Sequence, residues 1–266
     1  MNDAANTRTY PVVEYFCQVK KLNALTATTF EIDLEAPEGT ELEYAAGQYL
    51  ALELDVNGDG TPQSLSYTIA NNIDSSRPRR LQLFIQNGSE FANKILKTLS
   101  SLYENTERVK VTLAMGNAFL QTDLALPHLL IAAGSGIAKV KSITEEIIKQ
   151  QPDANVYIYW SNRQANEFYL LDTFEHWSNQ YRNLSFTPVL EVADPDWPVR
   201  SGYLYQVIQE DFDKLNDVQA YLCGSPQMVY GTIDRLEPKG LKETNCYSDV
   251  FEYMPRDKFT SAKGED

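Results

Sequence analysis

Three consecutive residues, Gly134-Ser135-Gly136, are the first candidates for chemistry in this sequence. They follow a short apolar run at residues 129–133 and precede an amphipathic, helix-like run at residues 139–150. A strand that turns through glycines into a helix presents backbone N–H groups to a phosphate. Many α/β units without a phosphate turn the same way, so the motif alone leaves both interpretations open.

Nucleophilic and metal-binding residues are scarce. Cys17, Cys223 and Cys246 lie far apart and match no zinc pattern or iron–sulfur ligand set, and the chain has only 2 histidines. Cys223 invites interpretation as a nucleophile. The pattern places no histidine near it, however, so a small residue that leaves room for a ligand is the favoured alternative. The sequence therefore predicts no metal site.

The elements that must position these residues fall into two halves. Before residue 123, short alternating runs between turns predict an all-β half with one helix that begins at Glu90. The expected strands cover residues 12–20, 28–34, 49–54, 65–70, 81–86 and 109–113. Six short strands at this spacing favour a closed barrel.

The second half alternates strands with helices. Strands are expected at residues 129–133, 155–160, 184–189 and 220–223, and helices at residues 139–150, 170–180, 205–209 and 226–236. This alternation predicts a parallel sheet with helices on both faces. We therefore expect a β domain over residues 1–122, an α/β domain over residues 123–255 and a polar tail over residues 256–266.

Composition excludes several classes of function. The formal net charge of −14 would repel nucleic acid, and no run approaches the 18 to 20 apolar residues that a membrane span needs. The first residues lack the basic and apolar regions of a secretory signal, so we expect a cytoplasmic protein.

Five motifs occur in a fixed order. They are Ala46-Gly47-Gln48-Tyr49-Leu50, Leu65-Ser66-Tyr67-Thr68-Ile69-Ala70-Asn71, Ala114-Met115-Gly116-Asn117-Ala118-Phe119-Leu120, the stretch from Ala133 to Lys139, and the pair formed by Tyr159-Trp160-Ser161-Asn162-Arg163 and Tyr221-Leu222-Cys223-Gly224-Ser225-Pro226-Gln227-Met228. Together they resemble the ferredoxin–NADP reductase superfamily, and within it the bacterial NAD(P)H:flavin reductases and their luciferase-associated relatives. The resemblance implies a six-stranded antiparallel Greek-key barrel that binds flavin, followed by a parallel α/β domain that binds NADH or NADPH.

The second motif implies the flavin site. By resemblance, Tyr67 packs against the flavin ring and the Thr68 hydroxyl addresses flavin N5, which gives Thr68 a catalytic position beside Ser66. An aromatic face matches a flat ring, and a hydroxyl can donate or accept. The family's arginine is replaced by Leu65, which cannot make a charge-assisted contact to a flavin phosphate. Three nearby arginines could compensate or simply be solvated, namely Arg77, Arg79 and Arg80.

Other flavin contacts are implied at two further places. Gly88 and Ser89 occupy the helix start where relatives receive a flavin pyrophosphate, although the small-residue string there is only partly kept. Phe251, in a segment that resembles the family's carboxyl-terminal motif, would cover the flavin ring. Packing alone would also explain Phe251.

The second half carries the implied pyridine-nucleotide site. By resemblance, Gly134, Ser135, Gly136 and Ile137 form the turn beside the nucleotide, and Lys139 adds positive charge. Arg163 is expected at the adenosine end. At the nicotinamide end we expect Cys223, Gly224 and Met228, with Cys223 in the catalytic position.

These features predict an oxidoreductase that transfers hydride from NAD(P)H to FMN, riboflavin or FAD, with the flavin held as a substrate or as a prosthetic group. Two alternatives stay open. One is a bound-flavin reductase that feeds a redox protein or oxygenase, and the other is a non-catalytic nucleotide-binding descendant that lost its flavin contact at Leu65.

Overall fold

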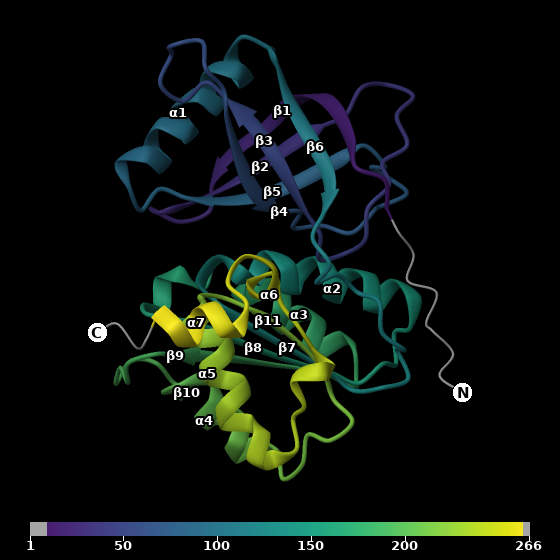
Figure 1. Ribbon diagram of the computed structural model, residues 1–266, viewed down its shortest axis with the longest axis vertical. Coiled ribbons are helices and arrows are strands. Elements are labelled where there is room, and N and C mark those ends of the chain that lie inside the picture. The colour runs from purple at the N-terminus through teal and green to yellow at the C-terminus, as the bar shows by residue number, and fades with distance from the viewer. Residues whose placement is uncertain (1–9, 263–266) are drawn as a thin grey trace.

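A computed structural model describes residues 10–262, which form two stacked parts (Figure 1). The upper part is an antiparallel sheet and the lower part is a parallel sheet between helices. The first sheet ends at Met115 and the second begins at His128, so the expected boundary near residue 122 falls in their connection. We expect no secretory signal at the start of the chain, and residues 1–9 lie outside the described residues.

Six antiparallel strands make the upper part. They run β1 (Val13–Ala24), β2 (Thr29–Glu35), β3 (Tyr49–Leu54), β4 (Gln63–Thr68), β5 (Arg80–Gln86) and β6 (Arg108–Met115), in the spatial order β4-β3-β6-β1-β2-β5. The ladder leaves β4 and β5 as its two edges. Just beyond β4, the Ala70 N–H donates to the Gln82 carbonyl of β5 at 2.7 Å, which brings these edges together. The expected six-stranded barrel is confirmed.

Helix α1 (Glu90–Glu104) covers one opening of this barrel. Its N-cap is Ser89, whose hydroxyl accepts the Ala92 N–H at 3.1 Å. Ile95, Leu96 and Leu99 lie on one face of the helix and are buried in the barrel core. The local sequence thus sets both the helix start and the face that packs.

The lower part contains a parallel sheet in the order β10-β9-β8-β7-β11-β12. Its strands are β7 (His128–Ala133), β8 (Val156–Asn162), β9 (Leu184–Leu190), β10 (Arg200–Ser201), β11 (Gln219–Cys223) and β12 (Cys246–Tyr247). The helices are α2 (Ile137–Gln150), α3 (Leu171–Gln180), α4 (Leu204–Asp211) and α5 (Pro226–Leu236), with short 3₁₀ turns η1 (Gly134–Gly136), η2 (Ala165–Glu167), η3 (Glu237–Lys239) and η4 (Glu243–Asn245).

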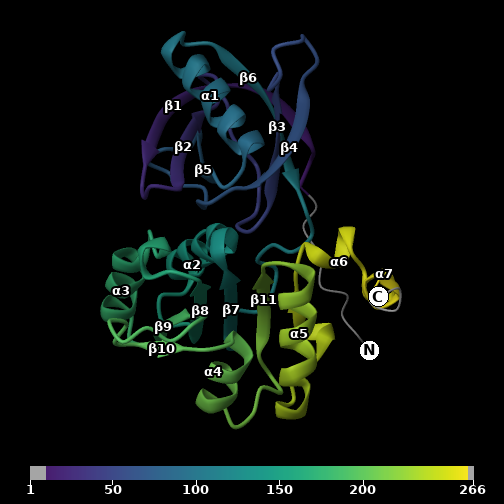
Figure 2. The same cartoon turned by 90° about the vertical axis from the view of Figure 1, so that its left-hand side faces the viewer.

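Side chains of the central strand β7 alternate between two cores. Leu130 and Ala132 join the core under α2 and α3, whereas Leu129 and Ile131 join the core under α4 and α5. Figure 2 shows these two helix pairs on opposite faces of the sheet. Because both faces are covered, the strand is apolar from Leu129 to Ala133, as is typical of a parallel sheet.

The carboxyl-terminal segment differs from the expected polar tail. It forms α6 (Val250–Tyr253) and then α7 (Arg256–Ala262), and residues 263–266 lie outside the described part. The Arg256 guanidinium lies 4.6 Å from the centre of the Tyr230 ring and pairs with Asp234 and Glu243. These partners are on α5 and η4, so the local polarity of the segment does not reveal its packing.

Two lysines of α2 join the two parts. The Lys139 ammonium is buried and donates to the carbonyls of Gly47 and Ala118 on the barrel side, and to the Asp249 carboxylate at 2.9 Å. Lys141, two residues further along α2, donates to the Ala70 carbonyl at 2.9 Å. These bonds hold the first turn of α2 against the barrel.

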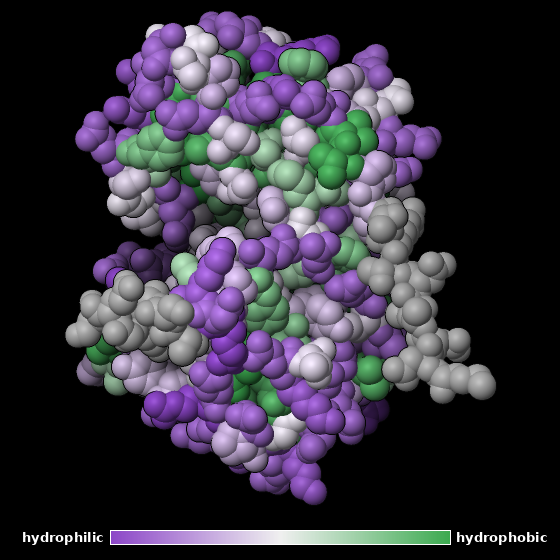
Figure 3. All heavy atoms as spheres, in the orientation of Figure 1, coloured by the Kyte–Doolittle hydropathy of each residue, from purple (hydrophilic) through white to green (hydrophobic). Residues whose placement is uncertain are grey.

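The surface agrees with the acidic composition. Figure 3 shows hydrophilic residues over much of the lower part on the face that it presents. Within residues 10–262, no helix is long and apolar enough to cross a membrane.

Candidate functional site

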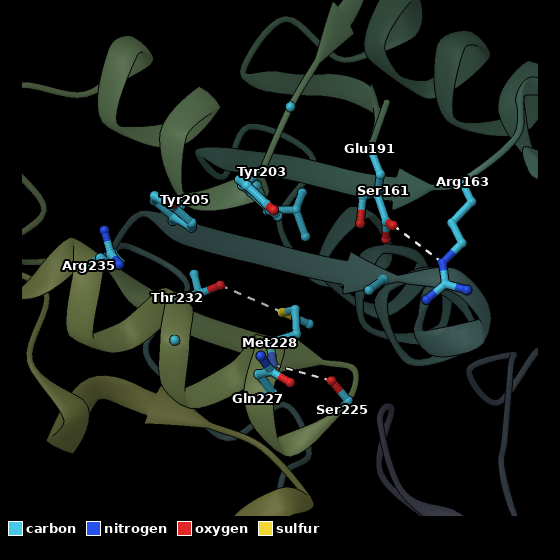
Figure 4. A pocket seen from close by; sticks show the side chains of 14 residues that line it. Ser161, Arg163, Glu191, Tyr203, Tyr205, Ser225, Gln227, Met228, Thr232 and Arg235 are labelled. Carbon is cyan, nitrogen blue, oxygen red and sulfur yellow. Dashed lines mark hydrogen bonds and ion pairs between the residues drawn. The ribbon is translucent and has the colours of Figure 1, made fainter. Parts of the chain in front are cut away.

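A pocket of about 530 Å³ opens at the carboxyl edge of the parallel sheet. Its wall comes from the ends of β7, β8 and β9 and from helices α4 and α5 (Figure 4). The carboxyl ends of parallel strands are where open α/β sheets bind ligands. The lining residues are Ala133, Ser161, Arg163, Glu191, Gly202, Tyr203, Leu204, Tyr205, Ser225, Gln227, Met228, Gly231, Thr232 and Arg235.

Arg163 and Glu191 form a charged pair at one end of this pocket (Figure 4). The Arg163 Nε lies 3.4 Å from Glu191 Oε2, and the Arg163 side chain is 85% exposed. The turn that carries Arg163 is held by Glu167, whose carboxylate accepts the backbone N–H groups of Arg163 and Gln164. The guanidinium therefore projects from a fixed backbone into solvent.

The opposite end of the pocket is aromatic and carries a second cation. The Tyr203 and Tyr205 rings are stacked at 5.6 Å, and the Arg235 guanidinium lies 5.2 Å from the centre of the Tyr205 ring. Tyr203 is 65% exposed and so offers a free ring face. Flat rings beside a guanidinium suit a nucleotide base and its phosphates.

The glycine turn at residues 134–136 lies beside the pocket, and Ala133, directly before it, is in the pocket wall. Gly136 packs so closely on the end of β11 that a Cβ atom there would lie 2.3 Å from the Cys223 carbonyl oxygen. At Gly134, φ is +54°, and its carbonyl accepts the Trp160 Nε1–H at 2.8 Å. Ser135 is exposed between these two glycines.

Two residues predicted near this turn are occupied elsewhere. The Ile137 side chain is fully buried in the core under α2, so it serves packing. Lys139, expected to add charge for a nucleotide, instead makes its bonds to the barrel and to Asp249. Sequence could not reveal this because Gly47, Ala118 and Asp249 are all remote along the chain.

Cys223 ends β11 against the glycine turn. Burial raises the pKa of its thiol to about 12, so the sulfur is protonated at neutral pH. A protonated, buried thiol is a poor nucleophile and behaves as a small apolar group. The geometry thus favours the interpretation of Cys223 as a residue that leaves room for a ligand.

Gly224 and Met228 lie together at the start of α5. A Cβ atom at Gly224 would lie 2.3 Å from the Met228 Cε, so the methionine packs directly over the glycine. Ser225 is the N-cap of α5 and its hydroxyl accepts the Met228 N–H at 3.2 Å. Of the predicted nucleotide residues, Arg163 and Met228 line the pocket.

The predicted flavin residues lie on β4 in the barrel. Leu65 and Tyr67 are half-buried against the barrel core, whereas Ser66 is exposed and Thr68 is half-buried. Burial also raises the pKa of the Tyr67 phenol. Thr68 pairs with Tyr49 of β3 in the ladder. The roles of these side chains beside a flavin stay predictions.

The three arginines that could compensate for Leu65 already have acidic partners. Arg77 pairs with Asp74, Arg79 pairs with Glu35, and Arg80 lies 2.8 Å from the Asp33 carboxylate. Their ion pairs favour a structural role over capture of a flavin phosphate.

The two remaining predicted flavin contacts have clear structural roles. Ser89 caps α1, and a Cβ atom at Gly88 would meet nothing within 4 Å, so no close approach requires this glycine. Phe251 is half-buried in α6, 5.7 Å from the Tyr230 ring centre, within the core under α5. Packing therefore explains Phe251, and its place over a flavin ring stays a prediction.

The pocket residues that sequence reasoning missed include the charged and aromatic side chains of Glu191, Tyr203, Tyr205 and Arg235. A signal existed for Glu191, because it comes two residues after the expected strand at 184–189 and thus at a ligand-binding strand end. Arg235 gives no such signal, since a basic residue in the last turn of a helix is ordinary. Among the described residues, no cluster of histidine, cysteine and carboxylate side chains could hold a metal ion.

Known proteins are similar to this chain over most of its length. Residues 130–233 match the family described as the oxidoreductase NAD-binding domain. The NAD(P)H-flavin reductase of Vibrio harveyi is 25% identical, with 90% of this chain and 98% of that protein covered. The CDP-6-deoxy-L-threo-D-glycero-4-hexulose-3-dehydrase reductase of Yersinia pestis is 28% identical, with 92% of this chain and 69% of that protein covered.

A solved structure shows the same fold. The ferredoxin NADP⁺ reductase of Neisseria gonorrhoeae, with bound FAD and NADP, superimposes with a TM-score of 0.66 at 18% identity and covers 87% of this chain and 93% of that one. The expected antiparallel barrel and parallel α/β domain are both confirmed. The chain is therefore similar to these reductases in its two-domain fold, and its residues 130–233 resemble an oxidoreductase NAD-binding domain.

Proposed function

We propose that this protein is an NAD(P)H-dependent flavin reductase. The observation that carries the proposal is the pocket at the carboxyl edge of the parallel sheet. The glycine turn η1, beside this pocket, contacts strand β5 of the barrel. One ligand in the pocket and one on the barrel would meet across this contact. Relatives named NAD(P)H-flavin reductase, which match the chain almost end to end, support the same conclusion.

The residues of the pocket fit a pyridine nucleotide. Its volume of about 530 Å³ lies in the ordinary range for small-molecule sites. Arg163 and Arg235 give positive charge for the phosphates, and Tyr203 gives an aromatic surface for a base. Ser161 and Ser225 add hydroxyl groups between the two ends.

The barrel fits a flavin that exchanges with solvent. Tyr67 and Thr68 offer the aromatic ring and the hydroxyl that a flavin ring needs, but Leu65 gives no charge for its phosphate. The neighbouring arginines are held by Asp33, Glu35 and Asp74. These features favour a flavin bound loosely as a substrate.

A pyridine nucleotide and a flavin, when bound, supply the hydride chemistry, so the chain's own residues bind and orient. Gly136 lets the turn after β7 pack closely on the end of β11, and the Cys223 thiol at that end is neutral. The Thr68 hydroxyl can donate or accept a hydrogen bond beside the flavin. No histidine base is needed, in line with the small number of histidines in the chain.

The proposal is tested by NAD(P)H oxidation, followed at the nicotinamide absorbance band, with FMN, riboflavin and FAD as separate acceptors. We expect colourless purified protein that oxidises the nucleotide only when free flavin is added. Absence of oxidation with every flavin, together with no thermal shift on adding flavin, would overturn the proposal and leave a non-catalytic nucleotide-binding protein.

A second candidate is transfer from a retained flavin to a separate redox protein or oxygenase. It is favoured by the relative named as a dehydrase reductase, of which this chain spans 69%. Purified protein that stays yellow with one flavin per chain, and turns over free flavin slowly, would support this candidate over the first.

A further inference from the structure

Resting on the proposed function, we infer that Gln82 is a positioning residue for hydride transfer. It lies on β5, where its buried side chain connects helix α2 to the barrel. Through this connection it fixes the flavin motif (residues 65–71) relative to the glycine turn at residues 134–136. Gln82 does not line the nucleotide pocket, so its effect is on the geometry between the two proposed sites.

Two opposite charges fix the direction of the Gln82 amide. Its Oε1 accepts the Lys141 ammonium at 2.9 Å, and its Nε2 donates to the Glu31 carboxylate. A rotation of the amide by half a turn would point its N–H groups at the ammonium and its oxygen at the carboxylate, so both contacts would become repulsive. These three side chains, the Lys141–Gln82–Glu31 clamp, therefore have one favourable arrangement.

The two charged members of the clamp are themselves fixed. Lys141 has three N–H donors, and they meet three acceptors: the Gln82 amide, the Glu145 carboxylate at 2.6 Å and the Ala70 carbonyl at 2.9 Å. Glu31 is also held by two cations of the barrel, Lys21 and Arg80. Neither charge can move toward water without losing several bonds.

The main chain of Gln82 holds the end of the flavin motif. Its carbonyl accepts the Ala70 N–H at 2.7 Å, and its N–H donates to Asn71 Oδ1 at 2.7 Å. From the other side, Lys141 donates to the Ala70 carbonyl. The Ser142 hydroxyl donates to the Asn71 carbonyl at 3.0 Å. The last two residues of the motif are thus bonded both to β5 and to α2.

The clamp lies close to both proposed ligand sites. Thr68, proposed to face the flavin, is two residues before Ala70, and Lys141 is five residues after Gly136. At 1.5 Å of rise per residue, about 7.5 Å of helix separates Lys141 from the glycine turn. Hydride transfer requires reacting atoms about 3 to 3.5 Å apart, and a misplacement of about 1 Å can cost about 100-fold in rate. A small shift at the clamp should therefore change the rate.

Lys139 joins the same helix to the barrel but does not hold the flavin motif. Its acceptors are the carbonyls of Gly47 and Ala118 and the Asp249 carboxylate. Loss of Lys139 should therefore weaken the contact between the two parts. Loss of the Gln82 amide should instead shift the flavin motif while α2 stays attached.

The test measures the hydride step directly, by stopped-flow bleaching of flavin absorbance when protein in excess over FMN is mixed anaerobically with NADH or NADPH. Gln82→Met removes both side-chain bonds and keeps a buried side chain of similar length. We expect a hydride step at least tenfold slower, with steady-state KM values for nucleotide and flavin within twofold of wild type. Gln18→Met, which removes a long, exposed hydrogen bond elsewhere in the barrel, should leave the rate unchanged.

An exchange of two side chains separates positioning from folding. Gln82→Glu alone brings two carboxylates together, because Glu31 remains, and should slow the hydride step and lower the melting temperature. Adding Glu31→Gln restores one carboxylate beside Lys141 and one amide next to it, with the hydrogen bond reversed. We expect this double variant to recover the rate to within about threefold of wild type. Recovery of the melting temperature without recovery of the rate would overturn the inference.

The outcomes distinguish this inference from the proposed function. No bleaching by the wild type with FMN, riboflavin or FAD and either nucleotide overturns the proposed function. Wild-type bleaching that is equally fast in Gln82→Met overturns only the role of Gln82, and so does a loss confined to KM. If Gln82→Met melts well below the wild type, the exchange of side chains decides.

Discussion

The pocket proposed to bind the nucleotide and the strand proposed to bind flavin differ in how their predicted residues are placed. In the α/β domain, charged and aromatic side chains from three strand ends and two helices converge on one cavity. In the barrel, Leu65 and Tyr67 lie against the core and the neighbouring cations are held in ion pairs. The first proposed site is thus formed by side chains from several strands and helices, whereas the second depends on a few residues of one strand.

The largest effect is expected where the nucleotide turn packs on β11. Gly136→Ala places a methyl group 2.3 Å from a backbone carbonyl oxygen, so strand and turn must separate. We expect a loss of about 3 kcal/mol or more in the free energy of unfolding, measured by urea denaturation. Gly88→Ala in the barrel is the control, because nothing lies within 4 Å of its Cβ position. Equal stability of the two variants would show that the turn is not tightly packed.

The contact between the two regions is tested by Lys139→Met. The change leaves Asp249 and the carbonyls of Gly47 and Ala118 without their donor. Loss of one partner from a buried ion pair should cost about 3 kcal/mol in unfolding free energy. Lys94→Met, which removes only an exposed ion pair with Glu90 within α1, should cost under about 1 kcal/mol. Similar losses at both positions would contradict a joining role for Lys139.

The comparison suggests that one residue could strengthen the weaker site. Leu65→Arg would supply the missing charge for a flavin phosphate, and FMN affinity should rise about tenfold in a fluorescence titration. Riboflavin, which has no phosphate, should gain little. Thr61→Arg, in the exposed loop before β4, controls for added charge. An unchanged FMN affinity would place residue 65 away from the phosphate.

The smallest effect concerns the pH dependence that Cys223 contributes. Burial raises the pKa of its thiol from 9.0 to about 12, so the unfolded chain releases this proton first as pH rises. The stabilisation is therefore complete below pH 9 and is lost progressively between pH 9 and pH 12. At pH 10 the loss should be on the order of 1 kcal/mol.

Comparison with Cys223→Ala isolates this contribution, because the tyrosines that titrate in the same range remain in both proteins. The fall in unfolding free energy between pH 8 and pH 10 should be smaller in the variant. At pH 8.5, iodoacetamide should label Cys223 only after denaturant is added. Rapid labelling of the native protein would restore the interpretation of Cys223 as a nucleophile.

Local signals explain what could be predicted from the sequence. Ser89 is the N-cap of α1, Ser225 is the N-cap of α5 and Pro226 is the first residue of α5, and both helices begin at the expected residues. Helix α7 was missed because its packing depends on Tyr230 and Glu243, far back along the chain. The role of Lys139 was missed for the same reason, since Gly47, Ala118 and Asp249 become its neighbours only in the fold, whereas the position of Glu191 after a predicted strand was a usable signal.

Helix α2 starts at the nucleotide turn and, within its first turn and a half, is bonded to the barrel through Lys139 and Lys141. The spacing between the two ligands is therefore set inside one rigid element and not by the chain that connects the domains. Lengthening that connection should leave the spacing intact, whereas a shift of α2 along its own axis would alter it directly. Helix α2 would then fix the distance between the two proposed ligands.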